Sequence, residues 1–218
     1  MSASEVESRA SGPYLRAQRL DDLAPEVQAE LEKLASTRGY LPEARVALAR
    51  RPEVLYALNR LDGAVMRAGT VDPVLKLLVA HVSSTAARSK RRQAQTAFGA
   101  RRRGAPDEKI ARVWECETSP LFSAAERAVL DLACAASMSP NAARAELFDR
   151  LREHFDEGEI VEIMAVVCLF GWNNRWNDSV ATNTPPATVE YAASVLATSG
   201  WRPGKDAGHA APDTVLPS

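Results

Sequence analysis

The chain has 218 residues, a formal net charge of -1, 46% hydrophobic residues and 25% charged residues. These values are typical of a globular protein, so they exclude a disordered or fibrous chain, and the lack of excess positive charge argues against a dedicated nucleic-acid binder. The longest apolar run, Ile160–Trp172, contains Glu162 and is too short to cross a membrane. No secretory signal is visible at the N-terminus, so we expect a cytoplasmic protein without membrane contact.

Apolar residues recur at three- and four-residue spacing along the whole chain, whereas alternating strand patterns are weak. The sequence therefore predicts an all-α fold, a single-domain helical bundle. We expect a flexible N-terminal segment over residues 1–20, a helical domain over 21–204 and a flexible tail over 205–218.

The N-terminal half predicts three helices. The first covers residues 22–36, and Pro52 opens a second that runs to about Met66. The segment Val74–Arg102 contains no proline and one glycine, Gly99, so it predicts one long continuous helix.

The C-terminal half begins with a turn near Gly104 and a helix that ends near Cys116. Further helices are predicted over residues 142–154 and 187–197. Two residue pairs have the spacing of a capping box and predict helix starts: Ser123 with Glu126, and Asp156 with Glu159. The helix after Asp156 is apolar nearly all round, which predicts a central position in the bundle.

The three cysteines are Cys116, Cys134 and Cys168, and none lies among the first 115 residues. Their odd number and apolar surroundings favour buried, reduced thiols over a disulfide framework. We identify no candidate metal ligands and expect no cofactor.

Several short segments occur in a fixed order over residues 39–204: Gly39-Tyr40-Leu41-Pro42, Arg51-Pro52-Glu53, Gln93-Ala94-Gln95-Thr96, Ser119-Pro120-Leu121-Phe122-Ser123 and Phe170-Gly171-Trp172-Asn173-Asn174. Together they resemble the carboxymuconolactone decarboxylase family, in particular its alkylhydroperoxidase-D-like (AhpD-like) members. The resemblance implies an all-helical subunit that forms a homo-oligomer, as a dimer, trimer or hexamer. It also implies a small-molecule pocket on the helix that carries Gln93–Thr96.

Peroxidases of this family carry Cys-x-x-Cys followed shortly by His. The resemblance puts Ser89 and Arg92 at the two cysteine positions and Gln95 at the histidine position. A register shifted by one residue puts Arg88 and Arg91 there instead. Serine has no accessible two-electron redox couple and arginine is no general base, so thiol peroxidase activity at this site is not expected.

At two more positions this sequence differs from the family pattern. The family glutamate falls at Lys76 or Leu77, and Arg88 stands where the family breaks the helix with a glycine.

On a continuous helix, polar side chains between His81 and Gly99 share one face. A binding site for a small, anionic substrate is one interpretation of this stripe, and a solvated face or subunit contact is the other. For the site we expect three catalytic residues, His81, Arg92 and Gln95. The expected substrate-binding residues are Ser84, Thr85, Arg88, Ser89, Trp172 and Trp176.

The basic residues between Arg88 and Arg103 have no acidic neighbour in the sequence from 73 to 106. Because no nucleic-acid-reading motif accompanies them, we interpret them as a solvated face that pairs with another subunit, rather than as a nucleic-acid site. The leading functional hypothesis is a non-redox enzyme that decarboxylates, dehydrates or isomerises an acidic or polar organic substrate. The alternatives are a non-catalytic binder of a ligand or partner, and residual peroxidase activity through Cys116 or Cys134.

Overall fold

The computed structural model describes residues 14–15 and 18–205. These residues form helices and connecting segments without β-strands, which confirms the predicted all-α fold. The α-helices are α2 (Pro25–Arg38), α3 (Glu43–Leu48), α4 (Pro52–Arg67), α5 (Pro73–Ala86), α6 (Lys90–Arg102), α7 (Asp107–Ala111), α8 (Ala124–Ser137), α9 (Ala145–Arg152), α10 (Glu157–Val180) and α11 (Pro186–Val195). Two short 3-10 helices are η1 (Leu20–Asp22) and η2 (Val113–Glu115).

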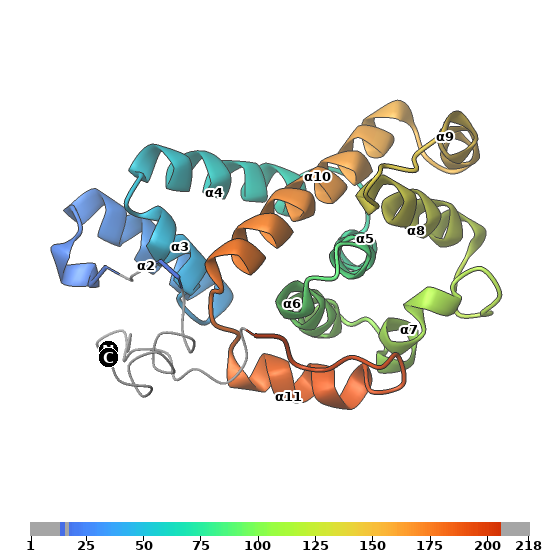
Figure 1. The fold of residues 1–218 in the computed structure, drawn as a ribbon. Helices are drawn as coiled ribbons and strands as arrows, with labels where there is room; N and C mark the ends of the chain where they lie inside the picture. Colours follow the sequence, from blue (N-terminus) through green and yellow to red (C-terminus); the bar gives the residue numbers. More distant parts are fainter. Residues whose placement is uncertain (1–13, 16–17, 206–218) are drawn as a thin grey trace.

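Helix α5 lies in the middle of the bundle, packed against α6, α8 and α10 (Figure 1). Side chains from three of these helices, among them Leu78, Leu132 and Ile163, are fully buried between them. Helix α10 runs diagonally across the molecule and contacts α4, α5, α6, α8 and α9, so its predicted central position is confirmed. Burial of this apolar surface supplies the main driving force for the fold.

Both predicted capping boxes are present. The Ser123 hydroxyl accepts a hydrogen bond from the backbone N–H of Glu126 at 3.2 Å, and the Glu126 carboxylate accepts one from the Ser123 N–H at 2.9 Å. Asp156 and Glu159 form the same reciprocal pair at the start of α10. Each box satisfies backbone donors that the first turn of a helix leaves without partners.

The expected continuous helix over 74–102 is wrong, because the chain breaks between α5 and α6. Arg88 has a φ of 58°, a left-handed conformation that favours glycine and that interrupts an α-helix. Helix α6 folds back along α5 after this residue, and Gly99 comes to lie beside Leu77. The break therefore falls where the family resemblance places a helix-breaking glycine.

Lys76, on α5, contacts the end of α4 through hydrogen bonds and α10 through an ion pair. Its side chain is buried, and its Nζ donates to the backbone carbonyls of Val65 at 2.9 Å and Ala68 at 2.6 Å. It also forms an ion pair with Glu162 on α10. Glu162 in turn accepts a hydrogen bond from the N–H of Thr70 at 3.0 Å. The ammonium group thus supplies donors to carbonyls at the C-terminal end of α4, and the carboxylate supplies an acceptor to an N–H just beyond it.

Other differences from the predicted helices are local. The six-residue helix α3 was not predicted, and the helix expected to reach Cys116 ends at Ala111 and is followed by η2. The helix expected over 142–154 is the shorter α9. The expected flexible ends, 1–20 and 205–218, lie almost entirely outside the described residues.

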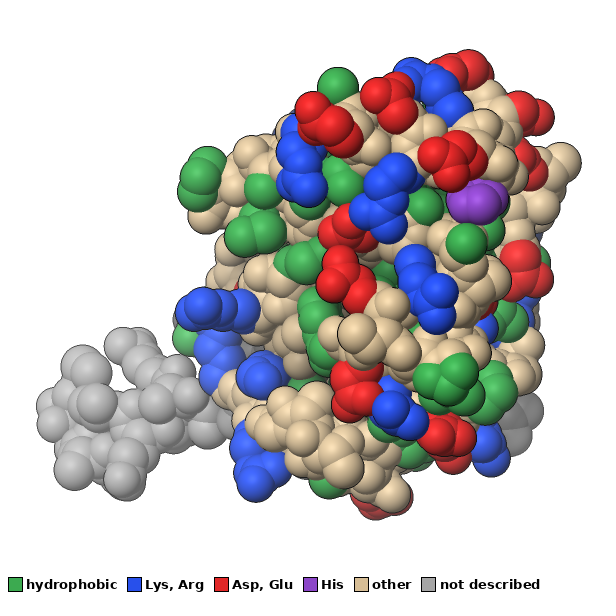
Figure 2. Space-filling view, turned by 90° about the vertical axis from the view of Figure 1, so that its right-hand side faces the viewer, with side chains coloured by type: hydrophobic (Ala, Val, Ile, Leu, Met, Phe, Trp, Pro, Cys, Tyr) green, Lys and Arg blue, Asp and Glu red, His purple; other side chains and the backbone are tan. Residues whose placement is uncertain are grey.

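Acidic and basic side chains are interspersed over the face shown in Figure 2. Cys116 and Cys134 are half-buried, whereas Cys168 on α10 is exposed, so the prediction of a buried thiol is wrong for Cys168. Over the described ranges, no helix is both long and apolar enough to cross a bilayer.

Candidate functional site

A cavity of about 320 Å³ opens between α4, α6 and the C-terminal end of α2, and we call it the outer cavity. Its volume lies at the lower end of the range typical for small-molecule sites. Among the described residues, five arginines line it: Arg38, Arg67, Arg92, Arg102 and Arg103. The single carboxylate among its described lining residues is Asp62. The cavity is therefore strongly cationic, although the whole chain carries a net charge of -1.

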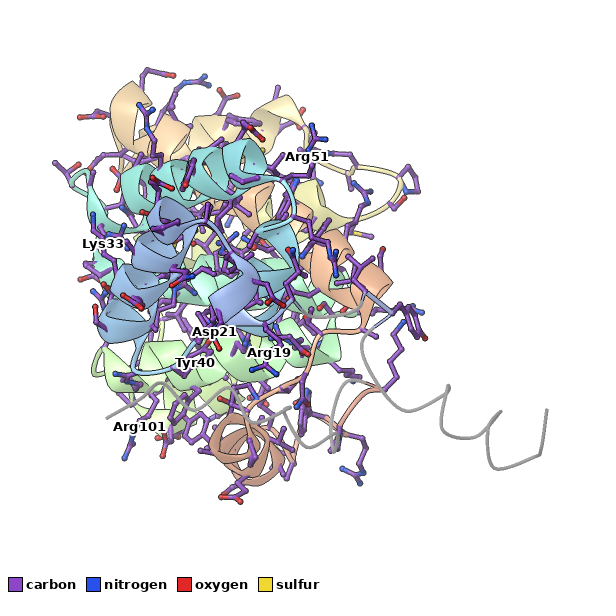
Figure 3. All side chains as sticks on the ribbon, turned by 90° about the vertical axis from the view of Figure 1, so that its left-hand side faces the viewer. Arg19, Asp21, Lys33, Tyr40, Arg51 and Arg101 are labelled. Atoms are coloured by element: carbon purple, nitrogen blue, oxygen red, sulfur yellow. The ribbon has the colours of Figure 1, made fainter. Side chains whose placement is uncertain are left out.

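The remaining lining residues are both apolar and polar. The apolar side chains come from four helices: Met66, Leu77, Phe98 and Phe170. The neutral polar ones include Tyr40, Gln95, Thr96 and Thr188. Tyr40, in the loop after α2, lies between α2 and α6 (Figure 3). A ligand with an anionic group and a hydrocarbon part would match both kinds of side chain.

Arg92, on the first turns of α6, lies at the cavity wall. Its Nη1 donates to the side-chain carbonyl of Gln95 at 2.8 Å, and its guanidinium lies 4.7 Å from the centre of the Phe170 ring. Its Nε–H is buried and has no acceptor among the described residues. A buried donor without an acceptor is unfavourable, and an anionic ligand would supply the missing acceptor.

The other arginines near Arg92 make its positive charge unfavourable. Burial, together with the charges of Arg91, Arg38 and Arg45, lowers the pKa of Arg92 to about 9. Arg38 and Arg45 share one carboxylate, that of Asp62, at 3.0 Å and 3.6 Å. The pKa of Arg45 is lowered to about 10, mainly by burial. This concentration of cations favours the binding of an anion.

A second, smaller cavity of about 20 Å³ lies next to the first, and we call it the inner cavity. Arg38, Tyr40, Arg92 and Gln95 line both cavities, so they form the wall between them. The inner cavity is lined further by Arg45 and Arg91, and by two buried asparagines, Asn173 and Asn177.

His81 does not line either cavity. It is buried between α5 and α6, where its Nδ1 lies 3.1 Å from the Gln93 carbonyl oxygen and 3.0 Å from Thr96 Oγ1. Because a carbonyl only accepts, Nδ1 carries the proton. Burial lowers the pKa of His81 to about 4, so the ring is neutral at pH 7. Its link to the site is Thr96, which lines the outer cavity.

The predicted stripe of polar residues is not one surface, since α5 and α6 are separate helices. Of the predicted catalytic residues, Arg92 and Gln95 lie together at the outer cavity and His81 lies behind its wall. None of the six predicted substrate-binding residues is among the residues that line the two cavities: Ser84, Thr85, Arg88, Ser89, Trp172 and Trp176.

These six residues have other contacts or positions. The hydroxyls of Ser84 and Thr85 donate to backbone carbonyls one helical turn earlier, and Ser89 donates to the Asp178 carboxylate at 2.8 Å. Trp172 and Trp176 stack on each other with their ring centres 5.5 Å apart. Arg88 is exposed at the break between α5 and α6.

The basic segment between α5 and α7 also differs from the expected solvated face. Arg91 is 3% exposed, and its Nη1 donates to the Asn177 side chain at 2.8 Å. Arg101 pairs with Asp107 within the same chain at 3.0 Å, and Arg102 and Arg103 line the outer cavity. Arg88, Arg101, Arg102 and Arg103 are exposed, whereas Arg91 is buried, so the expected solvated face holds for part of the segment only.

Sequence reasoning missed the cavity residues outside α6, including Arg38, Tyr40, Asp62 and Phe170. They come from the end of α2, from α4 and from α10, so only the tertiary packing brings them to Arg92. In the sequence, the one signal for any of these residues was the segment Gly39-Tyr40-Leu41-Pro42, which is part of the family resemblance and contains Tyr40.

The fold and the site define an all-helical protein with an arginine-lined cavity between α4 and α6. Residues 52–135, from the start of α4 into α8, match the carboxymuconolactone decarboxylase family. It is similar to the uncharacterized protein YnjA of Escherichia coli, with 29% identity over 132 residues that cover 60% of this chain and 72% of the relative.

Solved structures support the AhpD-like fold. The debrominase Bmp8 has a TM-score of 0.76 and 25% identity, with 83% of this chain and 96% of Bmp8 covered; a cysteine-to-alanine variant of it has been solved in complex with 2,3,4-tribromopyrrole. An uncharacterized peroxidase-related protein from Ralstonia eutropha, with an alkylhydroperoxidase AhpD core, has a TM-score of 0.72 and 18% identity over 84% of this chain and 96% of its own.

Proposed function

We propose that the chain is a small-molecule enzyme that binds an organic anion in the outer cavity and transforms it without thiol redox chemistry. The observation that carries this proposal is Arg92, with its buried and unpartnered Nε–H, in a cavity whose described lining has five arginines and one carboxylate. Decarboxylation, dehydration and isomerisation are the reaction classes that fit an anion with a developing enolate charge.

Arg92 and Gln95 would hold the carboxylate or enolate oxygen of the substrate. A guanidinium fixed by Gln95 and by the face of Phe170 is oriented before the ligand arrives, and preorganised donors of this kind stabilise charge as it develops. His81 acts as a positioning residue, because its hydrogen bond orients Thr96 at the cavity wall. We assign proton transfer to Asp62, the single carboxylate among the described lining residues.

The apolar lining supports a substrate with a ring or a short hydrocarbon skeleton. Phe98, Phe170, Leu77 and Met66 provide this surface. The similarity to Bmp8, whose solved complex contains a small halogenated ring, supports a ligand of that size. Residual peroxidase activity has less support, since burial raises the pKa of both Cys116 and Cys134 and disfavours the reactive thiolate.

Turnover is tested by incubating the protein with a panel of aromatic and aliphatic carboxylic acids and following substrate loss by mass spectrometry. At least one acid should be consumed by the native chain and not by Arg92→Met. The Asp62→Asn variant should retain binding, because it removes a negative charge from the site, but lose turnover. Binding of the acids without turnover of any would support the non-catalytic alternative.

We also propose that the protein forms a homo-oligomer through α10 and α4. Val161 and Trp172 on α10, and Val54 and Leu61 on α4, are large apolar side chains with 37–68% of their surface exposed. Each of these side chains would lose its contact with water if the two helices faced a second copy of the chain. Light scattering coupled to gel filtration should give a multimer for the native chain and a smaller species for Val161→Glu; a native monomer would rule the interface out.

A further inference from the structure

The inner cavity has lining residues that the proposed function does not use, among them Arg45 and Arg91. Its lining includes the guanidinium groups of Arg38, Arg45, Arg91 and Arg92, which can only donate hydrogen bonds. We propose that the inner cavity is a binding site for one small monovalent anion, of the size of chloride or bromide.

The size of the cavity sets the size of the occupant. A volume of about 20 Å³ holds one particle of about the size of a water molecule, and it is too small for a carboxylate with its carbon skeleton. A single small ion therefore matches this space better than the organic ligand of the outer cavity does.

The hydrogen-bonding groups favour an anion over water. The side-chain carbonyl of Gln95 already accepts from Arg91 and Arg92, and that of Asn177 accepts from Arg91 and Thr182. A water molecule needs acceptors as well as donors, whereas a halide needs donors alone.

The distribution of charge around the inner cavity also favours an anion. Asp62 is shared by Arg38 and Arg45 and is not among the residues that line the inner cavity. Arg45 is 5% exposed, so water screens its charge weakly. One bound anion beside Arg45 and Arg92 would offset the cost of burying these cations, and burial is the main cause of the lowered pKa of both groups.

Bromide is the probe for this site, because it scatters X-rays anomalously. Crystals of the native protein soaked in sodium bromide should show one anomalous peak among Arg45, Arg92 and Gln95. A soak that leaves the inner cavity without a peak, or that gives peaks only in the outer cavity or on the surface, would overturn the proposal. This measurement needs no variant and does not depend on the folding of one.

A titration in solution separates this site from the outer cavity. Sodium bromide should raise the melting temperature of the native chain in a saturable way, and Arg45→Met should remove the saturable part. Arg103→Met, which alters only the outer cavity, should keep it. Equal responses of native chain, Arg45→Met and Arg103→Met would contradict the assignment. Because bromide is not an organic acid, this result is independent of whether any carboxylic acid is bound or consumed.

Discussion

Arg92 Nη1 donates a 2.8 Å hydrogen bond to Gln95 Oε1 on the wall between the two cavities. One helical turn of α6 thus places a cation and its orienting amide side by side. Phe170, from α10, covers the face of the same guanidinium. This arrangement holds the arginine in place but leaves its buried Nε–H without an acceptor in the described part of the chain.

The His81→Asn variant should make the protein less sensitive to acid. The pKa of the buried His81 is lowered from 6.5 to about 4, so as pH falls the unfolded chain takes up the proton before the folded chain does. Stability present above pH 6.5 is therefore lost between pH 6.5 and about 4, by up to about 3 kcal/mol. Asparagine keeps a donor for the Gln93 carbonyl but does not titrate.

Denaturant unfolding at several pH values measures this effect. Native chain and the surface control His154→Asn should lose stability over the same pH window, and His81→Asn should lose less. An identical pH dependence in all three proteins would show that His81 is not the group responsible.

Lys76→Met should destabilise the fold strongly. The substitution leaves the Glu162 carboxylate without its ion-pair partner and removes the donor to the carbonyls of Val65 and Ala68, which costs about 3–5 kcal/mol. The double variant Lys76→Met with Glu162→Leu should recover part of this loss, because it removes the orphaned charge. Chemical denaturation measures both; additive losses in the double variant would argue against a coupled pair.

Gly99 tests whether the outer cavity is the binding site. A Cβ at this position would meet Leu77 at 3.4 Å, an ordinary contact, so Gly99→Ala should fold and gain about 0.5–1 kcal/mol of helix stability. Gly99→Leu should instead fill space at the cavity wall and weaken binding of benzoate, used as a probe carboxylate. If benzoate bound Gly99→Leu as tightly as Gly99→Ala, its site would lie elsewhere.

The thiols should be slow to react. Burial raises the pKa values of Cys116 and Cys134, and nearby carboxylates raise them further, so little thiolate forms at neutral pH. We expect no dithiol-dependent peroxide turnover and slower alkylation of these two residues than of the exposed Cys168. Peroxide turnover that disappeared in Cys116→Ser would restore the peroxidase hypothesis.

The sequence predicted the helices with clear local signals. Pro52 marks the start of α4, and the two capping boxes mark the starts of α8 and α10. The break at Arg88 was missed because a positive φ is uncommon for a residue with a side chain; its one signal was the family resemblance, which places a helix-breaking glycine at this position.

That single residue explains most of the difference between the predicted polar stripe and the residues that line the cavity. Because α6 folds back on α5, His81 contacts Gln93 and Thr96 and does not share one helix face with Arg92. Arg92 and Gln95 were found because they lie three residues apart on one helix. Tyr40 and Asp62 could not be assigned, since nothing local links them to α6.

Calorimetric titration with benzoate and with benzamide, its neutral counterpart, tests the central claim that the outer cavity binds anions through Arg92. Benzoate should bind the native chain, benzamide should bind much more weakly, and Arg92→Met should lose the difference while the surface variant Arg112→Met keeps it. Equal affinities of the native chain for the two compounds, or unchanged benzoate binding by Arg92→Met, would contradict the account.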